Sequence, residues 1–241
     1  MIDPAKIQSY FSLICETTQR AGQHFSERPT VKRGLSIIYD FLERESLVKP
    51  GDRLLDIGLG GGQACNVFTD RFAAEYWGIS IDPSEVSDAR VRGRKADLAD
   101  AHNLPFEDTS FDIVWASHVL EHCAAPLIVL YEWQRVLKDE GRILLWGPVG
   151  RDFKGKDDGT CVYGCRDHLI TPTEWQYRWL FELSRLQVEH ALDVPYQIQN
   201  EDQQRAYDRR KRLRGLLARF GLTLLPCYDV PNAIFFVLKH R

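Results

Sequence analysis

The sequence predicts an α/β fold in which helices cover both faces of a doubly wound, mostly parallel sheet. Between about residues 50 and 150, short apolar segments alternate with amphipathic ones, an order that is typical of parallel strands joined by crossover helices. The predicted strands are apolar along their whole length, as expected for strands that are covered on both faces. A glycine-rich turn after the first of them indicates a ligand site, because glycine lets a ligand approach the backbone closely.

Residues 1–47 are expected to form an N-terminal helical cap. Asp3-Pro4 is typical of a helix start, with Asp3 as the capping residue, and the amphipathic pattern continues to about Gln19. A second helical pattern occupies residues 35–42 and ends before Pro50-Gly51, a pair that stops helices. The cap is therefore expected to consist of two helices that precede the first strand.

The segment from residue 50 to residue 150 is expected to be the core of the fold. Strands are predicted at Arg53–Ile57, Tyr76–Ile81, Arg94–Asp97, Phe111–Ser117 and Arg142–Trp146. Helices are predicted between them at Gly62–Phe72, Ser84–Val91 and Pro126–Leu137. This alternation predicts the repeated crossover connections of a doubly wound sheet.

Residues 151–231 have a less regular pattern and are expected to form a C-terminal helical insertion on the acceptor side of the molecule. A helix is predicted to start at Thr171–Glu174 and to end near Leu183. Alternating apolar residues predict a strand over residues 186–192. A basic helix is predicted over residues 201–220. No known pattern of residues in this region identifies what it binds.

The whole chain, residues 1–241, is expected to be a single domain that closes with a last strand at residues 232–239. Because a short connection precedes this strand, it is expected to run antiparallel to the others. Hydrophobic residues make up 44% of the chain and charged residues 27%, the profile of an ordinary globular protein. A chain of this length buries enough apolar surface to fold without disulfides or a structural metal.

Several features indicate the cellular environment of the chain. No run of about 18 apolar residues is present, so no membrane span is predicted. The first residues lack a basic region followed by an apolar segment, so no secretory signal is predicted. The six cysteines are interpreted as free thiols in a reducing compartment. The sequence therefore favours a cytoplasmic protein.

The glycine-rich turn itself indicates which kind of ligand it binds. The first strand ends in Asp56, and Gly58, Gly60 and Gly62 then occupy every second position. A dinucleotide site needs the spacing G-x-G-x-x-G, which would require a glycine where Gln63 stands. The carboxylate of Asp56 would repel a pyrophosphate, whereas it suits a ligand that carries an ammonium and a sulfonium group. Spacing and charge therefore favour a cationic ligand over a dinucleotide.

Together with the segments that follow it, this turn resembles the class I S-adenosylmethionine-dependent methyltransferases. The pattern D-x-G-x-G-x-G resembles the first motif of that family. Three further segments, Ala99–Phe106, Ser110–Val114 and Val119–His122, resemble the D-A-x-x-L-P-F, F-D-x-V and V-L-E-H motifs of its small-molecule branch. The resemblance covers about residues 50–150, which it makes the cofactor-binding core. It implies a Rossmann-like fold, S-adenosyl-L-methionine as the cofactor, and methyl transfer as the reaction.

The resemblance also implies which residues hold the methionine part of the cofactor. Gly58, Gly60 and Gly62 would lie along its methionine and ribose portions. Asp56 would neutralise the methionine ammonium, either directly or through a water molecule. Ser117, at the end of the fourth predicted strand, would line the methionine end.

The adenosine part leaves one assignment open. Asp100, with the backbone of Ala101, would form hydrogen bonds to the adenine edge. Members of the family usually end the second strand in an acid that holds both ribose hydroxyls, but Ser80 stands at that position. Either Ser80 makes one weaker hydrogen bond, or Asp82 reaches back from two residues later. We favour Asp82, because one carboxylate can accept from two hydroxyls, although Asp82-Pro83 is also typical of a helix cap.

The reaction itself would require alignment of an acceptor behind the transferred methyl group and exclusion of water. A hydroxyl acceptor would also need a base to remove its proton, whereas an amine needs only to arrive neutral. His118, which follows the fourth predicted strand, and His168, in the segment after the fifth, are the candidate catalytic residues. Glu121 and His122 are expected to pack and cap rather than to catalyse.

The C-terminal third contains two further patterns. Cys161, Cys165 and His168 offer only three ligands at a spacing that is not standard for zinc, so no metal is predicted. Residues 205–219 contain seven basic residues and one acid, a charge that could attract an anionic acceptor, RNA or a lipid surface. The same charge is equally consistent with a solvated helix face.

The sequence therefore predicts an S-adenosylmethionine-dependent methyltransferase that acts on an oxygen or nitrogen of a small-molecule or glycan-like acceptor, which could be anionic. One alternative is an RNA methyltransferase that uses the basic helix, although nucleic acid is not the favoured partner. Another is a regulatory subunit that binds the cofactor without catalysing a reaction. The sequence leaves the identity of the acceptor and the oligomeric state open.

Overall fold

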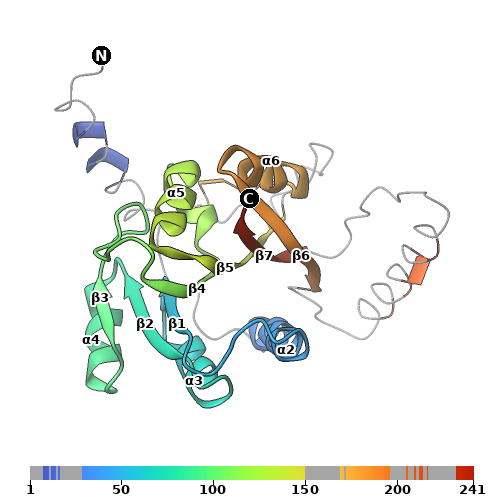
Figure 1. Ribbon diagram of the computed structural model, residues 1–241, viewed down its shortest axis with the longest axis horizontal. Coiled ribbons are helices and arrows are strands. Elements are labelled where there is room, and N and C mark those ends of the chain that lie inside the picture. Colours follow the sequence, from blue (N-terminus) through green and yellow to red (C-terminus); the bar gives the residue numbers. More distant parts are fainter. Residues whose placement is uncertain are drawn as a thin grey trace.

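A computed structural model describes residues 8–10, 12–14, 16, 29–149, 169–170, 172–195, 205, 209, 212–213, 216 and 232–241 of the chain. Within this part the chain forms a seven-stranded sheet with the order β3-β2-β1-β4-β5-β7-β6 (Figure 1). Its strands are β1 (Arg53–Ile57), β2 (Glu75–Ser80), β3 (Ala96–Leu98), β4 (Phe111–Ser117), β5 (Leu137–Pro148), β6 (Leu186–Pro195) and β7 (Asn232–His240). Neighbours from β3 to β5 are parallel, and β7 is antiparallel to both β5 and β6. The predicted α/β fold with an antiparallel last strand is confirmed.

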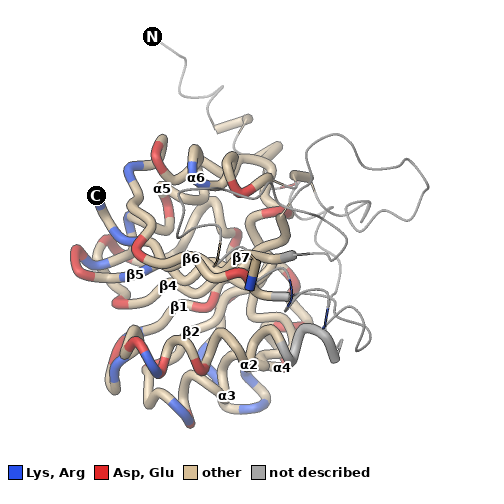
Figure 2. Tube along the Cα trace, turned by 90° about the vertical axis from the view of Figure 1, so that its right-hand side faces the viewer, with Lys and Arg blue, Asp and Glu red and all other residues tan. Residues whose placement is uncertain are grey.

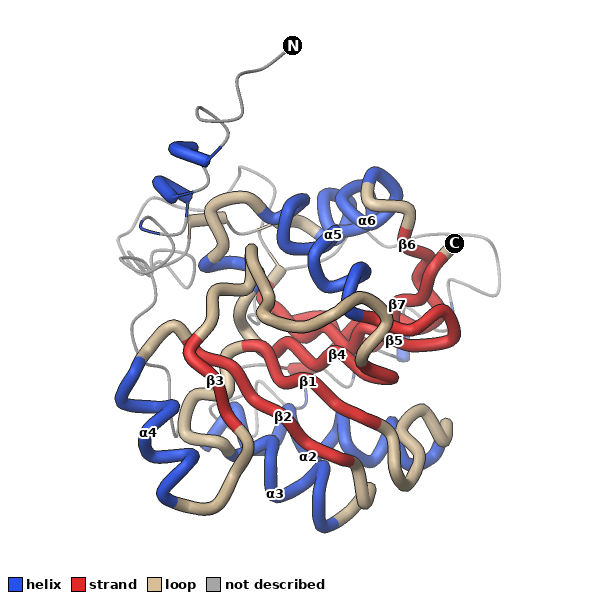
Figure 3. The backbone as a smooth tube through the Cα atoms, turned by 60° about the vertical axis from the view of Figure 1, so that its left-hand side comes forward, coloured by secondary structure: helices blue, strands red, loops and turns tan. Residues whose placement is uncertain are grey.

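Helices cover both faces of the sheet (Figure 3). One face carries α2 (Pro29–Arg44) and α3 (Gln63–Asp70), which pack in one apolar cluster with the sheet. The other face carries α5 (Pro126–Val136) and α6 (Glu174–Leu183), whose buried side chains belong to a second cluster. A smaller cluster joins α4 (Pro83–Val91) to β3. Figure 2 shows charged residues mainly along the helices and turns, as expected for a sheet buried between two layers.

The bounds of β1 and β4 are as predicted, and those of β2, β3, β6 and β7 differ by one to three residues at an end. The largest difference is at β5. This strand begins at Leu137 and not at the expected Arg142, because Leu137 already pairs with β4. A register shift separates that first pair from the pairing that resumes at Arg142. The polar residues within the shift include Lys138, whose Nζ donates to both carboxylate oxygens of Asp112 (2.9 and 2.8 Å). A segment that looks like a turn in the sequence is therefore an irregular start of the strand.

Two helix starts in the described part of the chain follow the predicted capping signals. The side chain of Asp82 caps α4 and Pro83 occupies its first turn. A capping box between Thr173 and Gln176 starts α6, as the segment around Thr171 predicts. Two other helices are expected near the N-terminus and in the basic segment. The residues of these helices that the structure describes, within 8–16 and 205–216, are helical. No helix in the described part of the chain has the length and apolar character that a membrane crossing needs.

The strand order reverses between β1 and β4, because β2 and β3 extend from one side of β1 while β4 and β5 extend from the other. The carboxyl ends of β1 and β4 therefore diverge into loops on opposite sides of a crevice, the position at which doubly wound sheets bind their ligands. Every residue that the sequence assigns to the cofactor lies at this edge of the sheet. Asp56, Ser80 and Ser117 lie at the ends of β1, β2 and β4, and the others lie in the loops after β1, β2 and β3.

Candidate active site

The glycine loop connects β1 to α3 at the carboxyl edge of the sheet. Gly58, Gly60 and Gly62 have φ angles of 75°, 49° and 71°, values in the left-handed region that only glycine adopts without strain. The backbone N–H groups of Gly58 and Leu59 both donate to the carbonyl of Ile79 in β2 (2.9 Å each). The loop is thereby fixed against the end of β2.

The three glycines of this loop are needed for two different reasons, space for a ligand and close packing against neighbouring residues. A Cβ atom placed on Gly60 would meet no atom within 4 Å in the described part of the chain, so open space lies beside the backbone there. A Cβ on Gly58 would lie 2.8 Å from Val119 Cγ2, and one on Gly62 would collide with the guanidinium of Arg94. The loop therefore leaves room for a ligand and brings the end of β1 against the residues that follow β4.

Asp56 lies in β1 two residues before Gly58, and its side chain is buried, with 2% of the residue exposed. The hydroxyl of Tyr76 in β2 donates to Asp56 Oδ2 (2.6 Å). Burial raises the pKa of Asp56 to about 7, because the Tyr76 hydrogen bond only partly offsets desolvation and the nearby Glu85 charge raises it further. Near neutral pH this carboxyl is therefore divided between its acid and its ionised form, and a neighbouring cation would favour the ionised form.

The end of β2 contains the two candidates for the ribose, Ser80 and Asp82, and a second carboxylate, that of Glu85. Asp82 Oδ1 accepts from the backbone N–H and the hydroxyl of Ser84 (2.8 and 2.7 Å), which makes it the cap of α4. Ser80 is buried, and its hydroxyl lies 2.6 Å from Glu85 Oε2 in the first turn of α4. The end of β2 therefore holds Glu85 as well as the two residues that the sequence analysis considers for the ribose.

Asp100, the predicted adenine ligand, follows β3 in the order of the chain. Its Oδ1 accepts from the backbone N–H of His102 (2.9 Å) and lies 2.6 Å from His102 Nδ1. The backbone N–H of Ala125 donates to His102 Nε2 (3.3 Å), which assigns the imidazole proton to Nδ1. The buried His102 thus donates to Asp100 and fixes its carboxylate. Ala101 between them is also buried.

Ser117 is the last residue of β4, and His118 follows it with a φ of 57°. This left-handed conformation is strained for a residue with a side chain, and such strain is concentrated at functional sites. His118 is held there by two contacts with Trp146 in β5. Its backbone N–H donates to the Trp146 carbonyl (2.8 Å), and the two rings meet edge-on with their centroids 4.6 Å apart. The imidazole is therefore fixed at the carboxyl end of β4.

A buried carboxylate holds the other side of this imidazole. His118 Nδ1 lies 3.0 Å from Oε1 of Glu121, which is completely buried and belongs to the short helix η1 (Leu120–His122). Burial raises the pKa of Glu121, but the hydrogen bond from His118 and the charges of His118 and His122 outweigh it and hold the pKa below its usual value. Glu121 is therefore a carboxylate that orients His118.

His168, the second predicted base, lies outside the described residues, as do Cys161 and Cys165. The described chain resumes at Leu169. Its backbone N–H and that of Ile170 donate to the carbonyl of Glu121 (2.8 and 3.1 Å). The segment that follows His168 is thus bound to the residue that orients His118.

Comparison with known proteins identifies the domain. The family model described as Methyltransferase domain matches residues 55–145, which run from β1 through β5 and include the glycine loop and the His118–Glu121 pair. Residues 55–145 are a class I S-adenosylmethionine-dependent methyltransferase domain. S-adenosylmethionine is the methyl donor of this family. This confirms the resemblance that the motifs indicate.

Two curated relatives of the chain are identical to it at about a third of the aligned residues. The 27-O-demethylrifamycin SV methyltransferase of Amycolatopsis mediterranei is 35% identical over 127 residues, which are 49% of this chain and 47% of the relative. The malonyl-[acyl-carrier protein] O-methyltransferase of Herminiimonas arsenicoxydans is 36% identical over 96 residues, 39% of this chain and 36% of the relative. The chain thus spans about half or less of the length of these relatives.

The fold as a whole matches solved methyltransferase structures. A putative sarcosine dimethylglycine methyltransferase from Galdieria sulphuraria superimposes with a TM-score of 0.64 at 17% sequence identity. The match covers 96% of this chain and 97% of that one. At this level of identity the match shows a shared fold and does not indicate which acceptor is methylated.

The residues of the methyltransferase fit S-adenosylmethionine in two respects. The space beside Gly60 has no side chain in its way among the described residues, so a ligand can lie along the loop. The carboxyl groups of Asp56, Glu85 and Asp100 lie at the ends of β1, β2 and β3, and they suit a cofactor with a positively charged ammonium and sulfonium better than they suit a pyrophosphate.

Two carboxylates of the methyltransferase site were not assigned to it from the sequence. Glu121 lies three residues after His118, a spacing that places both on one side of a helical turn, so recognition of the short η1 helix could have paired them. Glu85 lies five residues after Ser80 across a strand-to-helix turn. No local pattern gives the direction in which α4 leaves β2, so the sequence alone could not bring Glu85 back to Ser80.

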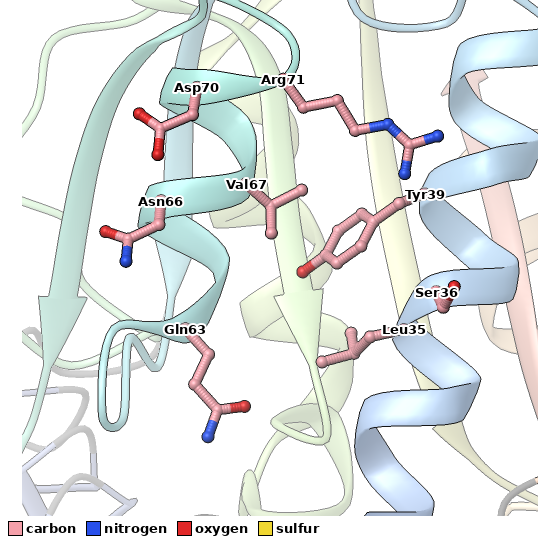
Figure 4. Close-up of a pocket in the computed structure, with 8 residues that line it drawn as sticks. All are labelled: Leu35, Ser36, Tyr39, Gln63, Asn66, Val67, Asp70 and Arg71. Atoms are coloured by element: carbon pink, nitrogen blue, oxygen red, sulfur yellow. The ribbon is translucent and has the colours of Figure 1, made fainter.

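A cavity of about 460 Å³ lies between α2 and α3 (Figure 4). It is lined by Leu35, Ser36, Tyr39, Gln63, Asn66, Val67, Asp70 and Arg71. Figure 4 shows Tyr39 extending from α2 toward α3, with its hydroxyl directed to the end of the cavity where Gln63 begins α3. That hydroxyl is buried and has no hydrogen-bond partner within the described part of the chain. One end of the cavity is thus one residue away from the glycine loop.

Proposed function

We propose that this chain transfers a methyl group from S-adenosylmethionine to a hydroxyl group of a small-molecule acceptor. His118 acts as the general base in this proposal, and Glu121 is the residue that positions it. The single observation that supports the proposal is the hydrogen-bonded pair of His118 and the buried Glu121 at the carboxyl end of β4. The pair is adjacent in sequence to Val119, which lies against Gly58 of the cofactor loop.

The mechanism follows from the roles of these groups. S-adenosylmethionine supplies a methyl group on a positively charged sulfur, which an acceptor oxygen can displace in line. The glycine loop and the carboxylates of Asp56 and Asp100 bind and orient the donor. Glu121 accepts the Nδ1 proton of His118, so Nε2 is the nitrogen that takes the hydroxyl proton of the acceptor. The negative charge of Glu121 then stabilises the imidazolium that this proton transfer produces.

A hydroxyl acceptor is favoured over an amine for two reasons. An amine that arrives neutral can attack the methyl group without a base, whereas a hydroxyl gains from proton removal as it attacks, and the His118–Glu121 pair is built for proton removal. Both curated relatives described above are named for methylation at oxygen. Because each match covers less than half of the relative, these names support the atom that is methylated and not the identity of the acceptor.

The experiment that tests this proposal is a screen of hydroxylated small molecules with methyl-labelled S-adenosylmethionine, followed by variants of the pair. We expect His118→Gln to lower kcat/KM about 10²- to 10⁴-fold, the usual contribution of a general base. Binding of S-adenosylhomocysteine should change little, because in this proposal His118 acts on the acceptor and not on the donor. Glu121→Gln should lower kcat and leave KM nearly unchanged, since it acts through His118. His190→Gln, at a half-buried histidine in β6, is the matched control.

Three results would contradict this proposal in different ways. Tight binding of S-adenosylhomocysteine without methylation of any acceptor would favour the regulatory subunit. Methylation of RNA, with affinity that falls steeply as salt rises, would favour the RNA methyltransferase. Full activity of His118→Gln on a hydroxylated acceptor would reject His118 as the base.

A further inference from the structure

The cavity between α2 and α3 contains a buried polar group that no residue in the described part of the chain satisfies. Tyr39 extends into the cavity from α2, and 5% of the residue is exposed (Figure 4). Its hydroxyl has no hydrogen-bond partner among the described residues. A buried hydroxyl without a partner is destabilising, and such groups are rare in native proteins. The reaction proposed above assigns no role to this hydroxyl.

Aromatic packing fixes the direction of the Tyr39 hydroxyl. The Tyr39 ring lies edge-on to Phe68, with the two centroids 5.7 Å apart. It also contacts Trp115 and Phe72, whose ring centroids lie at 6.0 and 6.5 Å. Side chains in such densely packed cores stay in defined rotamers. Burial and the charge of Asp56 raise the pKa of Tyr39, so the hydroxyl keeps its proton near neutral pH. The hydroxyl is therefore a fixed hydrogen-bond donor.

The cavity has the size and the lining of a small-molecule site. Its volume of about 460 Å³ lies within the range of ligand pockets, which is roughly 300–1,000 Å³. Leu35 and Tyr39 extend from α2 toward α3, and Val67 extends from α3 between the helices (Figure 4). These side chains make the middle of the cavity apolar, while Gln63 lies at one end and Arg71 at the other (Figure 4). Apolar walls with a few fixed polar groups are typical of sites that bind small molecules.

The charges around the cavity favour an uncharged ligand over an anion. Among the described lining residues the cation is Arg71, whose Nη2 donates to Asp40 Oδ1 (2.8 Å) and also pairs with Glu43. Two carboxylates of α2 therefore already neutralise the charge of this guanidinium. Asp70 adds a further negative charge to the lining, and Asp56 is close enough for its charge to act on the phenol. An anion in the cavity would be repelled by these carboxylates.

The phenol also disfavours a cationic ligand. An ammonium group has donors and no acceptor, so it could not accept the proton of the Tyr39 hydroxyl. A carbonyl or ether oxygen accepts a hydrogen bond without carrying a charge. It can therefore satisfy the phenol while the rest of the ligand contacts the apolar walls.

We propose that the cavity between α2 and α3 binds an uncharged, largely apolar small molecule whose carbonyl or ether oxygen accepts the hydrogen bond of Tyr39. This site is distinct from that of S-adenosylmethionine, whose ammonium and sulfonium groups are suited to carboxylates and not to a phenol in an apolar cavity. The inference goes beyond the proposed function, because it depends neither on the methyl acceptor nor on the base.

The test compares two probes that differ in one atom of the functional group. Acetophenone has a carbonyl oxygen, and 2-phenylpropene has a methylene group in its place. Binding to the full chain is followed by NMR of isotope-labelled methyl groups, at Leu35 and Val67 in the cavity and at Val129 in α5 on the other face of the sheet. Both probes should shift the signals of Leu35 and Val67 and leave that of Val129 unchanged. Benzoate, an anion of similar size, should shift none of them.

The variant Tyr39→Phe removes only the hydroxyl. It should weaken the binding of acetophenone about 3- to 10-fold, the usual contribution of one hydrogen bond between neutral groups, and change that of 2-phenylpropene less than about twofold. Tyr131→Phe is the matched control, because Tyr131 is an exposed tyrosine of α5 whose hydroxyl donates to the carbonyl of Leu183 (3.0 Å). It should bind both probes like the unaltered chain.

Four results would overturn the inference. The cavity takes no such ligand if neither probe shifts the signals of Leu35 and Val67. The charge argument is wrong if benzoate shifts them as strongly as acetophenone does. An equal loss of affinity for both probes in Tyr39→Phe means that the substitution acts through packing and not through the hydrogen bond. Displacement of acetophenone by S-adenosylhomocysteine means that the cavity belongs to the donor site. None of these results bears on methyl transfer, so the proposed function is tested separately.

Discussion

Asp56 illustrates how a single residue at this site serves binding and opposes stability. Its carboxyl group is nearly completely buried, and its pKa of about 7 differs from the value of 3.8 for an exposed aspartate. An acid with a raised pKa in the native state makes that state hold its proton while the unfolded chain releases it. The stability of the native state therefore decreases as pH rises from about 4 to about 7. A cationic ligand that favours the ionised form would recover part of this loss.

We therefore expect Asp56→Asn to stabilise the free protein and to weaken cofactor binding. Its free energy of unfolding at pH 7 should rise by about 1–3 kcal/mol, because an amide needs no ionisation in the buried site. The gain should be smaller at pH 5, where the native carboxyl is mostly protonated. Urea unfolding at the two pH values measures this difference. Affinity for S-adenosylhomocysteine should fall at least tenfold in the same variant, as expected for loss of the charge that faces its ammonium.

The control for Asp56 is Asp70→Asn, at an exposed aspartate of α3. This substitution should change the stability by less than about 0.5 kcal/mol at either pH. If Asp56→Asn raises the free energy of unfolding equally at pH 5 and pH 7, then packing and not ionisation limits the stability of the native site. A loss of stability at pH 7 would contradict the raised pKa altogether.

Among the elements, α5 supports the adenine side of the site without contributing to it. Arg135 in α5 donates from Nη1 to the carbonyl of Phe106 (2.7 Å) and from Nη2 to that of Leu104 (3.1 Å). The same guanidinium pairs with Glu132 and Asp108. These contacts hold the segment that begins at Asp100 against the helix.

We expect Arg135→Ala to loosen this segment and to weaken cofactor binding at a distance. The substitution leaves two buried or half-buried carbonyls without their donor, so the free energy of unfolding should fall by about 1–3 kcal/mol. Affinity for S-adenosylhomocysteine should fall several-fold, because Asp100 is less well fixed. Arg178→Ala in α6 is the control, since Arg178 pairs only with Glu174 within its own helix among the hydrogen bonds of the described residues. Unchanged affinity in Arg135→Ala would show that the His102 contacts alone position Asp100.

The same elements show which parts of the fold a sequence can predict. The bounds of β1 and β4 agree with the prediction because their apolar runs are bordered by polar residues that end a strand. The early start of β5 could not be predicted, since it depends on the pairing of Leu137 with a neighbouring strand and on the Lys138–Asp112 contact. Such pairing is decided by tertiary structure, and local composition suggests a turn instead.

At the scale of the whole molecule, the topology determines how the site is assembled. Four loops that are distant in the sequence meet because β3, β2, β1 and β4 are consecutive neighbours in the sheet. The sequence predicts the glycine loop and Asp100 from motifs, each of which is local. The His118–Glu121 and Ser80–Glu85 pairs depend on how η1 and α4 leave the sheet. Motifs therefore indicate the cofactor, whereas these contacts between elements are visible only in the structure.

The assembled site predicts how the stability of the whole protein responds to ligands. S-adenosylhomocysteine at 100 times its Kd should add about 2.7 kcal/mol to the free energy of unfolding, because it binds only the native state. For a chain of 241 residues, this corresponds to a rise in Tm of about 5–10 °C. NADH should leave Tm unchanged, since Gln63 interrupts the dinucleotide spacing and Asp56 repels a pyrophosphate. Differential scanning calorimetry with each ligand measures both effects, and a rise with NADH but not with S-adenosylhomocysteine would reverse the assignment of the glycine loop.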